Sequence, residues 1–101
     1  MVYTVKILPI ALKDLRNEKI WYQEQSENIG EEFKKEIYQE IDYISKNPNH
    51  FQLKYQSIRQ ALVKPFPYAI FYFIDEERAR IVLVGILHVK RNPKIIQKRI
   101  K

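Results

Sequence analysis

Hydrophobic and polar positions follow two different periods along the first half of this chain. Residues 2–8 (VYTVKIL) are rich in β-branched and aromatic side chains, which predicts a strand. Pro9 then ends the strand and suits the first turn of a helix, where its missing N–H is not required. From there to about Ser26 an apolar stripe predicts a helix, and its members are Leu8, Leu12, Leu15, Ile20 and Tyr22.

A second helical period begins after a short connection at residues 27–30. Its apolar residues recur at i, i+4, i+8 and i+11, as Phe33, Ile37, Ile41 and Ile44. Asn28 is placed to cap this helix, with Glu31 three residues later as in a capping box, and Pro48 stops it. Two amphipathic helices with so short a join predict an antiparallel helical hairpin, and residues 49–56 are expected to form a loop.

The second half of the chain contains three runs of strand length, at residues 58–64, 67–75 and 80–89. The joins between them are short, so neighbouring strands are expected to be antiparallel. In the last run, alternation predicts two apolar faces. One face would carry Ile81, Leu83 and Leu87, and the other Val82, Val84 and Ile86.

The element order β-α-α-β-β-β predicts a single α+β domain over residues 1–101. We expect two layers, an antiparallel-dominated sheet with the helical hairpin packed on one face, and a short basic C-terminal segment. The hairpin can cover only one face of the doubly apolar last strand. The other face must be covered by the C-terminal segment, by curvature of the sheet, or by another molecule. Ile95, Ile96 and Ile100 are the candidates within the chain.

Composition removes several classes of function. With two glycines there is no phosphate-cradling loop, and with no cysteine and two histidines a structural zinc site is not expected. The serines do not lie in a nucleophile elbow. From these absences together we expect no metal and no cofactor. No apolar run approaches the ~20 residues that span a bilayer. We therefore expect a cytoplasmic protein with no membrane partner.

Charge is distributed unevenly along the chain. Residues 1–56 hold eight Lys or Arg against nine Asp or Glu, whereas residues 57–101 hold ten against three. From His88 onward there are six basic residues and no acid. This asymmetry indicates a polyanionic target, an acidic partner protein, or a solvated basic tail that maintains solubility.

The chemistry that remains is cationic. Arg and Lys can hold phosphates and stabilise developing negative charge, and His can transfer a proton near neutral pH, so such a set could cleave RNA without a metal. The candidate catalytic residues are Arg59, Lys64, His88 and Arg91. The candidate residues for binding a target or partner are Tyr68, Tyr72, Lys90, Lys94, Lys98 and Arg99. Roles without a function in catalysis or binding remain open for several of these residues: a surface position for His88, core packing for the tyrosines, and a salt bridge for Arg59.

Several of these segments together resemble the RelE/ParE superfamily of toxins from bacterial type II toxin–antitoxin systems. The resemblance covers the whole chain, from ALKDL in the first helix through Gly30 before EEF to KNP after the second helix. Its most specific parts are Arg59, Phe66-Pro67-Tyr68 and His88 followed by Arg91-Asn92-Pro93, which are similar to the ParE-like branch.

The resemblance implies one of two activities. ParE-like toxins are associated with poisoning of DNA gyrase, and RelE-like toxins cleave mRNA on the ribosome without a metal. RNase members commonly carry an Arg at the start of the second strand of the meander, where this chain has Ala69. The loss of that cation favours gyrase poisoning, unless Arg59, Lys64, His88 or Arg91 compensates. Whether the protein is an enzyme depends on that choice.

The resemblance also implies a cognate antitoxin as partner, in a toxin–antitoxin hetero-oligomer. We expect the antitoxin to lay a helix or strand over the apolar and basic surface of the meander and the C-terminal segment, with its acidic residues facing the positive half of the chain. A third hypothesis is a degenerate nucleic-acid-binding module that has lost toxicity. It predicts salt-dependent binding without growth inhibition.

Overall fold

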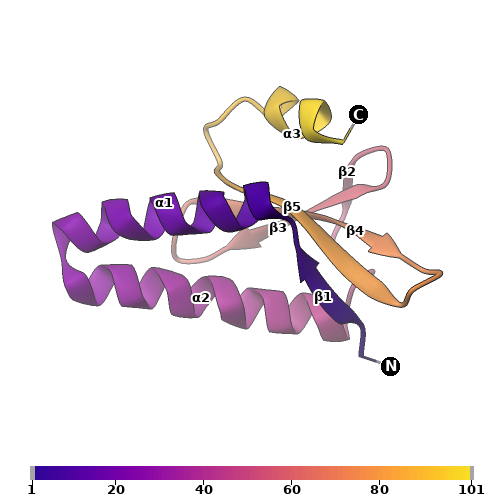
Figure 1. The fold of residues 1–101 in the computed structure, drawn as a ribbon, viewed down its shortest axis with the longest axis horizontal. Helices are drawn as coiled ribbons and strands as arrows, with labels where there is room; N and C mark the ends of the chain where they lie inside the picture. The colour runs from indigo at the N-terminus through magenta and orange to yellow at the C-terminus, as the bar shows by residue number, and fades with distance from the viewer. Residues whose placement is uncertain (1, 101) are drawn as a thin grey trace.

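Five strands and three helices form this α+β domain, seen in a computed structural model that describes residues 2–100 (Figure 1). The elements are β1 (Thr4–Ile7), α1 (Pro9–Gln25), α2 (Glu27–Lys46), β2 (Leu53–Tyr55), β3 (Ile58–Val63), β4 (Tyr68–Asp75), β5 (Arg80–His88) and α3 (Lys94–Arg99). The sheet order is β1-β5-β4-β3-β2, with β1 parallel to β5 and the other neighbours antiparallel. The α+β class, the hairpin and the meander are confirmed.

Two boundaries differ from the sequence prediction. The loop expected at residues 49–56 contains β2, which pairs with β3 through Leu53–Arg59 and Tyr55–Ile58 and turns at Gln56 with a φ of 46°. A three-residue strand is too short to show a period. The second helix begins at Glu27 with Ser26 at the N-cap, so the Asn28 capping box is wrong; Ser26 makes no side-chain cap hydrogen bond.

The helical hairpin packs on one face of the sheet, and its stripe on α2 is as predicted. Phe33, Ile37, Ile41 and Ile44 are all buried. On α1 the predicted stripe is only partly right, because Leu12 and Ile20 are exposed while Ala11 and Leu15 are buried. At Gly30 a Cβ would lie 2.9 Å from the Cβ of Gln23, so the glycine permits the close approach of the two helices.

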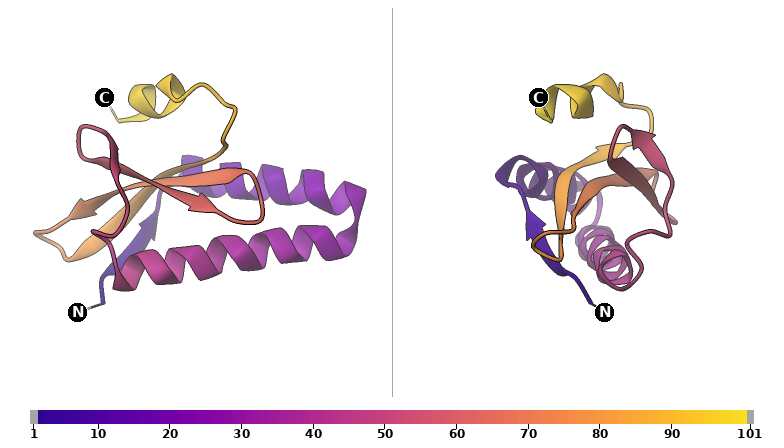
Figure 2. Two further views of the ribbon diagram at one scale, coloured as in Figure 1. Left: turned by 180° about the vertical axis from the view of Figure 1, so that it is seen from behind. Right: turned by 90° about the vertical axis from the view of Figure 1, so that its right-hand side faces the viewer.

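Part of the opposite face of the sheet is covered by α3, as Figure 2 shows in its end-on view. Ile96 is fully buried there, with Ile95 and Ile100 packed beside the same cluster. Of the three alternatives for covering this face, the chain itself supplies the cover over this part, whereas Leu62, opposite Ala69 on the same face, is 51% exposed. The expectation that an antitoxin seals the bare apolar sheet is therefore wrong for the area beneath α3.

A bulge in β5 changes which residues occupy each face. The register pairs Phe71 with Gly85 and Tyr72 with Leu83, so Val84 is the extra residue. Ile86 consequently joins the cluster under the hairpin and Leu87 joins the cluster under α3. Strict alternation had predicted the reverse for these two residues, because one inserted residue inverts every following side chain.

Candidate functional site

The candidate residues are organised around β4, the central strand. Tyr68 lies opposite His88 on β5, and Tyr72 lies opposite Arg59 on β3. Tyr68 and Tyr72 are four residues apart, which corresponds to about 13 Å along a strand. The structure therefore divides these residues into two groups, one at the start of β4 around Tyr68 and one at its middle around Tyr72, and Arg59 is not brought together with His88.

The group around Tyr72 holds the segment that follows α2 in place. Arg59 donates a hydrogen bond of 2.6 Å from Nη1 to the carbonyl oxygen of Phe51, and its Nη2 lies 3.4 Å from Oδ1 of Asn49. The fully buried Tyr72 donates from its hydroxyl to the carbonyl of Pro48 at 2.7 Å. Burial raises the pKa of Tyr72 to about 12, although the positive charge of Arg59 opposes the rise. Both side chains are thus engaged in holding the chain's own backbone.

The group at the Tyr68 end faces an open cleft. Tyr68 donates a hydrogen bond from its hydroxyl to Oε2 of Glu18 on α1. Burial raises the pKa of Tyr68, and the adjacent Glu18 carboxylate raises it further because it favours the protonated phenol. The ring of Tyr68 lies 5.2 Å from that of His88, nearly edge-on at 74°. These residues line a cleft of about 420 Å³ together with Trp21 and Tyr22; we call this five-residue site the aromatic cup.

The ring of His88 is tied to the turn that follows β5. Its Nδ1 accepts a hydrogen bond of 3.0 Å from the backbone N–H of Lys90, and its carbonyl accepts one of 2.9 Å from the N–H of Arg91. An imidazole whose Nδ1 accepts a hydrogen bond carries its proton on Nε2. The Nδ1 of His88 is therefore engaged with the backbone of the turn and is not open to a substrate in this conformation.

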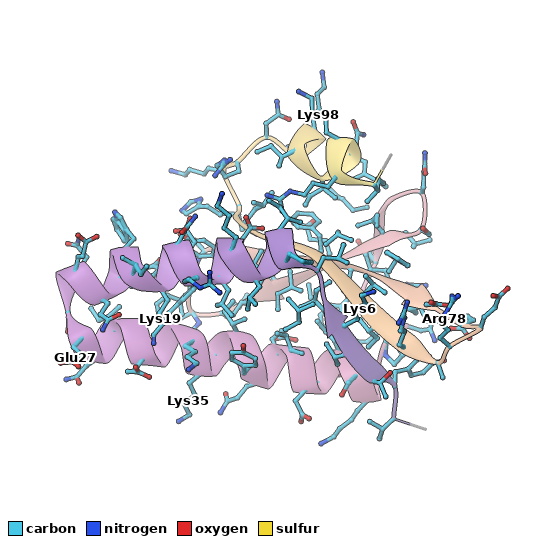
Figure 3. The ribbon with its side chains drawn as sticks, in the orientation of Figure 1. Lys6, Lys19, Glu27, Lys35, Arg78 and Lys98 are labelled. Atoms are coloured by element: carbon cyan, nitrogen blue, oxygen red, sulfur yellow. The ribbon has the colours of Figure 1, made fainter. Side chains whose placement is uncertain are left out.

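The remaining cations fall in two places, at a second cleft and in the segment after β5. Lys64 lines a separate cleft of about 440 Å³ between β2 and β3, together with Lys54, Gln60 and Leu62. Lys90, Arg91, Lys94 and Lys98 are exposed after β5. Figure 3 shows Lys98 extending from α3 away from the sheet.

Arg99 and Ala69 are not exposed, and both take part in contacts within the protein. Arg99 makes a bidentate ion pair with Asp14, through Nη1 to Oδ2 at 2.7 Å and Nη2 to Oδ1 at 3.0 Å. Ala69, the position that the family resemblance matches to an arginine of RNase members, is buried in the cluster beneath α3. A long cationic side chain at that site would have to displace part of this cluster.

The sequence analysis did not identify Asp14, Glu18 or Trp21 as candidate site residues. Asp14 and Glu18 are four residues apart on α1 and lie beside the buried Ala11 and Leu15, so they face the sheet. Acids next to a buried helical stripe are unusual, since buried carboxylates need partners. That contrast is the signal that could have found them.

Among residues 2–100 there is no group of three His, Asp or Glu side chains that could hold a metal ion. Nor does that part of the chain contain a helix long and apolar enough to cross a bilayer.

The fold is shared with solved toxin structures. One is the toxin–antitoxin complex RelBE2 from Mycobacterium tuberculosis, with 18% identity, a TM-score of 0.60, and coverage of 87% of this chain and 99% of that one. A mutant of the E. coli toxin RelE in the free state matches at 11% identity and a TM-score of 0.60, over 98% and 94% of the two chains. The isolated E. coli RelE toxin matches at 15% identity and 0.56, over 98% and 99%. No curated protein sequence matched the chain.

These similarities define the fold of the chain as that of the solved RelE toxins. The sequence pattern of the family described as "ParE toxin of type II toxin-antitoxin system, parDE" matches residues 5–93. The chain therefore belongs to the ParE toxin family of type II toxin–antitoxin systems.

Proposed function

We propose that this toxin arrests growth by binding and poisoning DNA gyrase in the cytoplasm, without cleaving RNA. The observation that carries the proposal is the separation of the cations along β4. Arg59 is committed to the carbonyl of Phe51, and His88 lies opposite Tyr68, four residues along β4 from the residue opposite Arg59. Metal-independent RNA cleavage needs acid, base and cations around one phosphate, since each acts only within hydrogen-bond reach.

Two further observations support the same conclusion. Ala69 is buried beneath α3 and offers no charge to a phosphate. The Nδ1 of His88 is occupied by the N–H of Lys90, so that atom is not free to contact a substrate. Neither observation disfavours a protein target.

A supercoiling assay with purified gyrase tests the proposal. Added toxin is expected to inhibit supercoiling and to accumulate cleaved DNA, in proportion to toxin concentration. Arg91→Ala is the test variant, since it changes an exposed residue of the ParE-like motif. It should weaken inhibition while the protein remains folded. Normal supercoiling at excess wild-type toxin would reject gyrase as the target.

Ribosome-dependent mRNA cleavage is the second candidate, because the aromatic cup places the Tyr68 hydroxyl, the Glu18 carboxylate and the His88 ring at one open cleft. Primer extension on translated messages separates it from gyrase poisoning. New cleavage sites that disappear with His88→Ala would favour the RNase hypothesis. An unchanged cleavage pattern after His88→Ala and Arg91→Ala would remove both residues from that mechanism.

We also propose that a cognate antitoxin neutralises the toxin. The solved M. tuberculosis relative is a toxin–antitoxin complex, and the exposed cations after β5 offer a positive surface to acidic residues. Co-expression with the product of the neighbouring gene is expected to restore growth, and the two proteins should co-purify. If the toxin alone leaves growth unaffected and no complex forms, the antitoxin proposal fails.

A further inference from the structure

The aromatic cup has the features of a cation-binding site, although the chain as a whole is basic. Its walls come from three elements: Glu18, Trp21 and Tyr22 from α1, Tyr68 from β4 and His88 from β5. The cleft is open to solvent, and its volume of about 420 Å³ would accommodate one side chain.

The charge at the base of the cup is negative. Glu18 accepts the hydroxyl of Tyr68 on Oε2, a hydrogen bond that leaves its other oxygen with lone pairs for a further donor. Within residues 2–100, Glu18 makes no ion pair; the neighbouring Lys19 pairs instead with Glu31 on α2. A positive group entering the cup would therefore find a carboxylate that has no cationic partner of its own.

The rings around Glu18 are arranged edge to face. Trp21 and Tyr22 have centroids 4.9 Å apart at 83°, and Tyr22 and Tyr68 are 6.0 Å apart at 66°. In such an arrangement the ring planes are turned in different directions, so a group in the cleft can meet a ring face as well as ring edges. Ring faces carry the negative part of the aromatic quadrupole and attract cations. Trp21, the best cation–π partner among the side chains, is 53% exposed.

We propose that the aromatic cup receives the guanidinium group of an arginine from a partner protein. A planar guanidinium can stack on Trp21 while it donates hydrogen bonds to the free oxygen of Glu18, which a lysine ammonium cannot do with the same geometry. A nucleotide base could stack on the same rings, but its phosphate would be repelled by the carboxylate. The inference goes beyond the choice of target, because it concerns the chemistry of one subsite.

The test uses tryptophan emission, since Trp21 is the single tryptophan of the chain. The full-length toxin would be titrated to tens of millimolar with N-acetylarginine amide, N-acetyllysine amide, N-acetylcitrulline amide and cytidine monophosphate. Citrulline has the shape of arginine without its charge. We expect a saturable change in emission with the arginine probe, weaker binding of the lysine probe, and no saturation with citrulline or the nucleotide.

A variant series ties the response to the carboxylate. Glu18→Gln keeps the size of the side chain and an acceptor for Tyr68, and is expected to weaken arginine binding about five-fold or more. Glu24→Gln, an exposed position on the same helix, is the matched control and should bind like the wild type. Circular dichroism confirms that both variants are folded.

If Glu18→Gln does not fold, Tyr68→Phe serves as the second variant, and we expect it to bind arginine with altered affinity because the carboxylate loses its positioning partner. Equal responses to arginine and citrulline would overturn the proposal. So would undiminished binding by Glu18→Gln, or tighter binding of the nucleotide, which would assign the cup to nucleic acid.

Discussion

Asp14 and Arg99 lie 85 residues apart in the sequence and are joined by a bidentate ion pair. Oδ2 of Asp14, which accepts a hydrogen bond from Nη1 of Arg99, also accepts one of 3.0 Å from the backbone N–H of Ile86, just after the bulge in β5. Arg99 adds a hydrogen bond from Nη1 to the carbonyl of Val84 at 3.1 Å. One carboxylate on α1 therefore satisfies the disturbed backbone of β5 and holds α3 on the sheet.

Arg99→Ala is expected to lower the free energy of unfolding by about 2 kcal/mol, because it leaves Asp14 partly desolvated beside one N–H. The paired side chains are 16% and 14% exposed, so the loss should fall below that of a fully buried pair. Arg78→Ala is the matched control. Arg78 also pairs with an aspartate but is 62% exposed, so it should cost less than about 1 kcal/mol. Urea unfolding measures both, and equal losses would contradict this account.

Gly85→Ala is expected to loosen α3 from the sheet. An added Cβ would lie 2.5 Å from Cδ1 of Ile96 and 2.7 Å from Nη1 of Arg99. Both atoms end flexible side chains, but Ile96 is fully buried and Arg99 is held by Asp14, so the loss should be about 1–2 kcal/mol. Hydrogen exchange of the α3 amides should accelerate more than that of α2. Unchanged stability with unchanged exchange would show that α3 accommodates the methyl group.

Tyr72→Phe is expected to cost about 1–2 kcal/mol at neutral pH, because the carbonyl of Pro48 loses its donor in a buried site. The wild type should also lose stability as pH rises from about 10 to about 12. In that window the unfolded chain releases the phenol proton while the native protein, with the pKa of Tyr72 raised by burial to about 12, retains it. The slope contributed by one such group is at most about 1.4 kcal/mol per pH unit.

Urea unfolding at several pH values separates this tyrosine from the others. Tyr72→Phe should show a shallower decline in stability above pH 10 than the wild type. Tyr38→Phe, which removes the hydroxyl of an exposed tyrosine, should follow the wild-type curve. If both variants decline equally, the alkaline transition does not belong to Tyr72.

Arg59→Ala and Arg91→Ala are expected to act in different ways. Arg59 supports the segment after α2 through its charge-assisted bond to Phe51, so its loss should cost about 1.5–3 kcal/mol of stability. Arg91 is exposed and makes no ion pair with any residue from 2 to 100, so its removal should change stability by less than about 0.5 kcal/mol. Thermal denaturation and growth inhibition, measured for both variants, distinguish the roles. A stable Arg59→Ala protein that has lost toxicity would make Arg59 a target contact.

Much of this fold can be predicted from short stretches of the sequence. The stripe of Phe33, Ile37, Ile41 and Ile44 and the three runs of the meander predicted α2, β3, β4 and β5, because hydrophobic period follows directly from backbone geometry. The family resemblance likewise rested on contiguous segments such as Phe66-Pro67-Tyr68, and the family match confirms it.

The site was less predictable, because it depends on which side chains meet across distant elements. The sequence analysis placed Arg59 and His88 together as catalytic candidates, yet their strands carry them to positions four residues apart along β4 and into different contacts. Glu18 and Trp21 became visible as partners of Tyr68 and His88 only once α1 lay against the sheet.

The sequence by itself determined the two helices of the hairpin, the meander, the basic second half and the toxin family, all of which depend on neighbouring residues or on composition. Only the tertiary structure decided the inverted faces after Val84, the cover of the sheet by α3, and the carboxylates that hold Arg99 and Tyr68. The physical reason is that a bulge, a docked helix and a long-range ion pair are set by packing between segments far apart in the chain, and no local period records them.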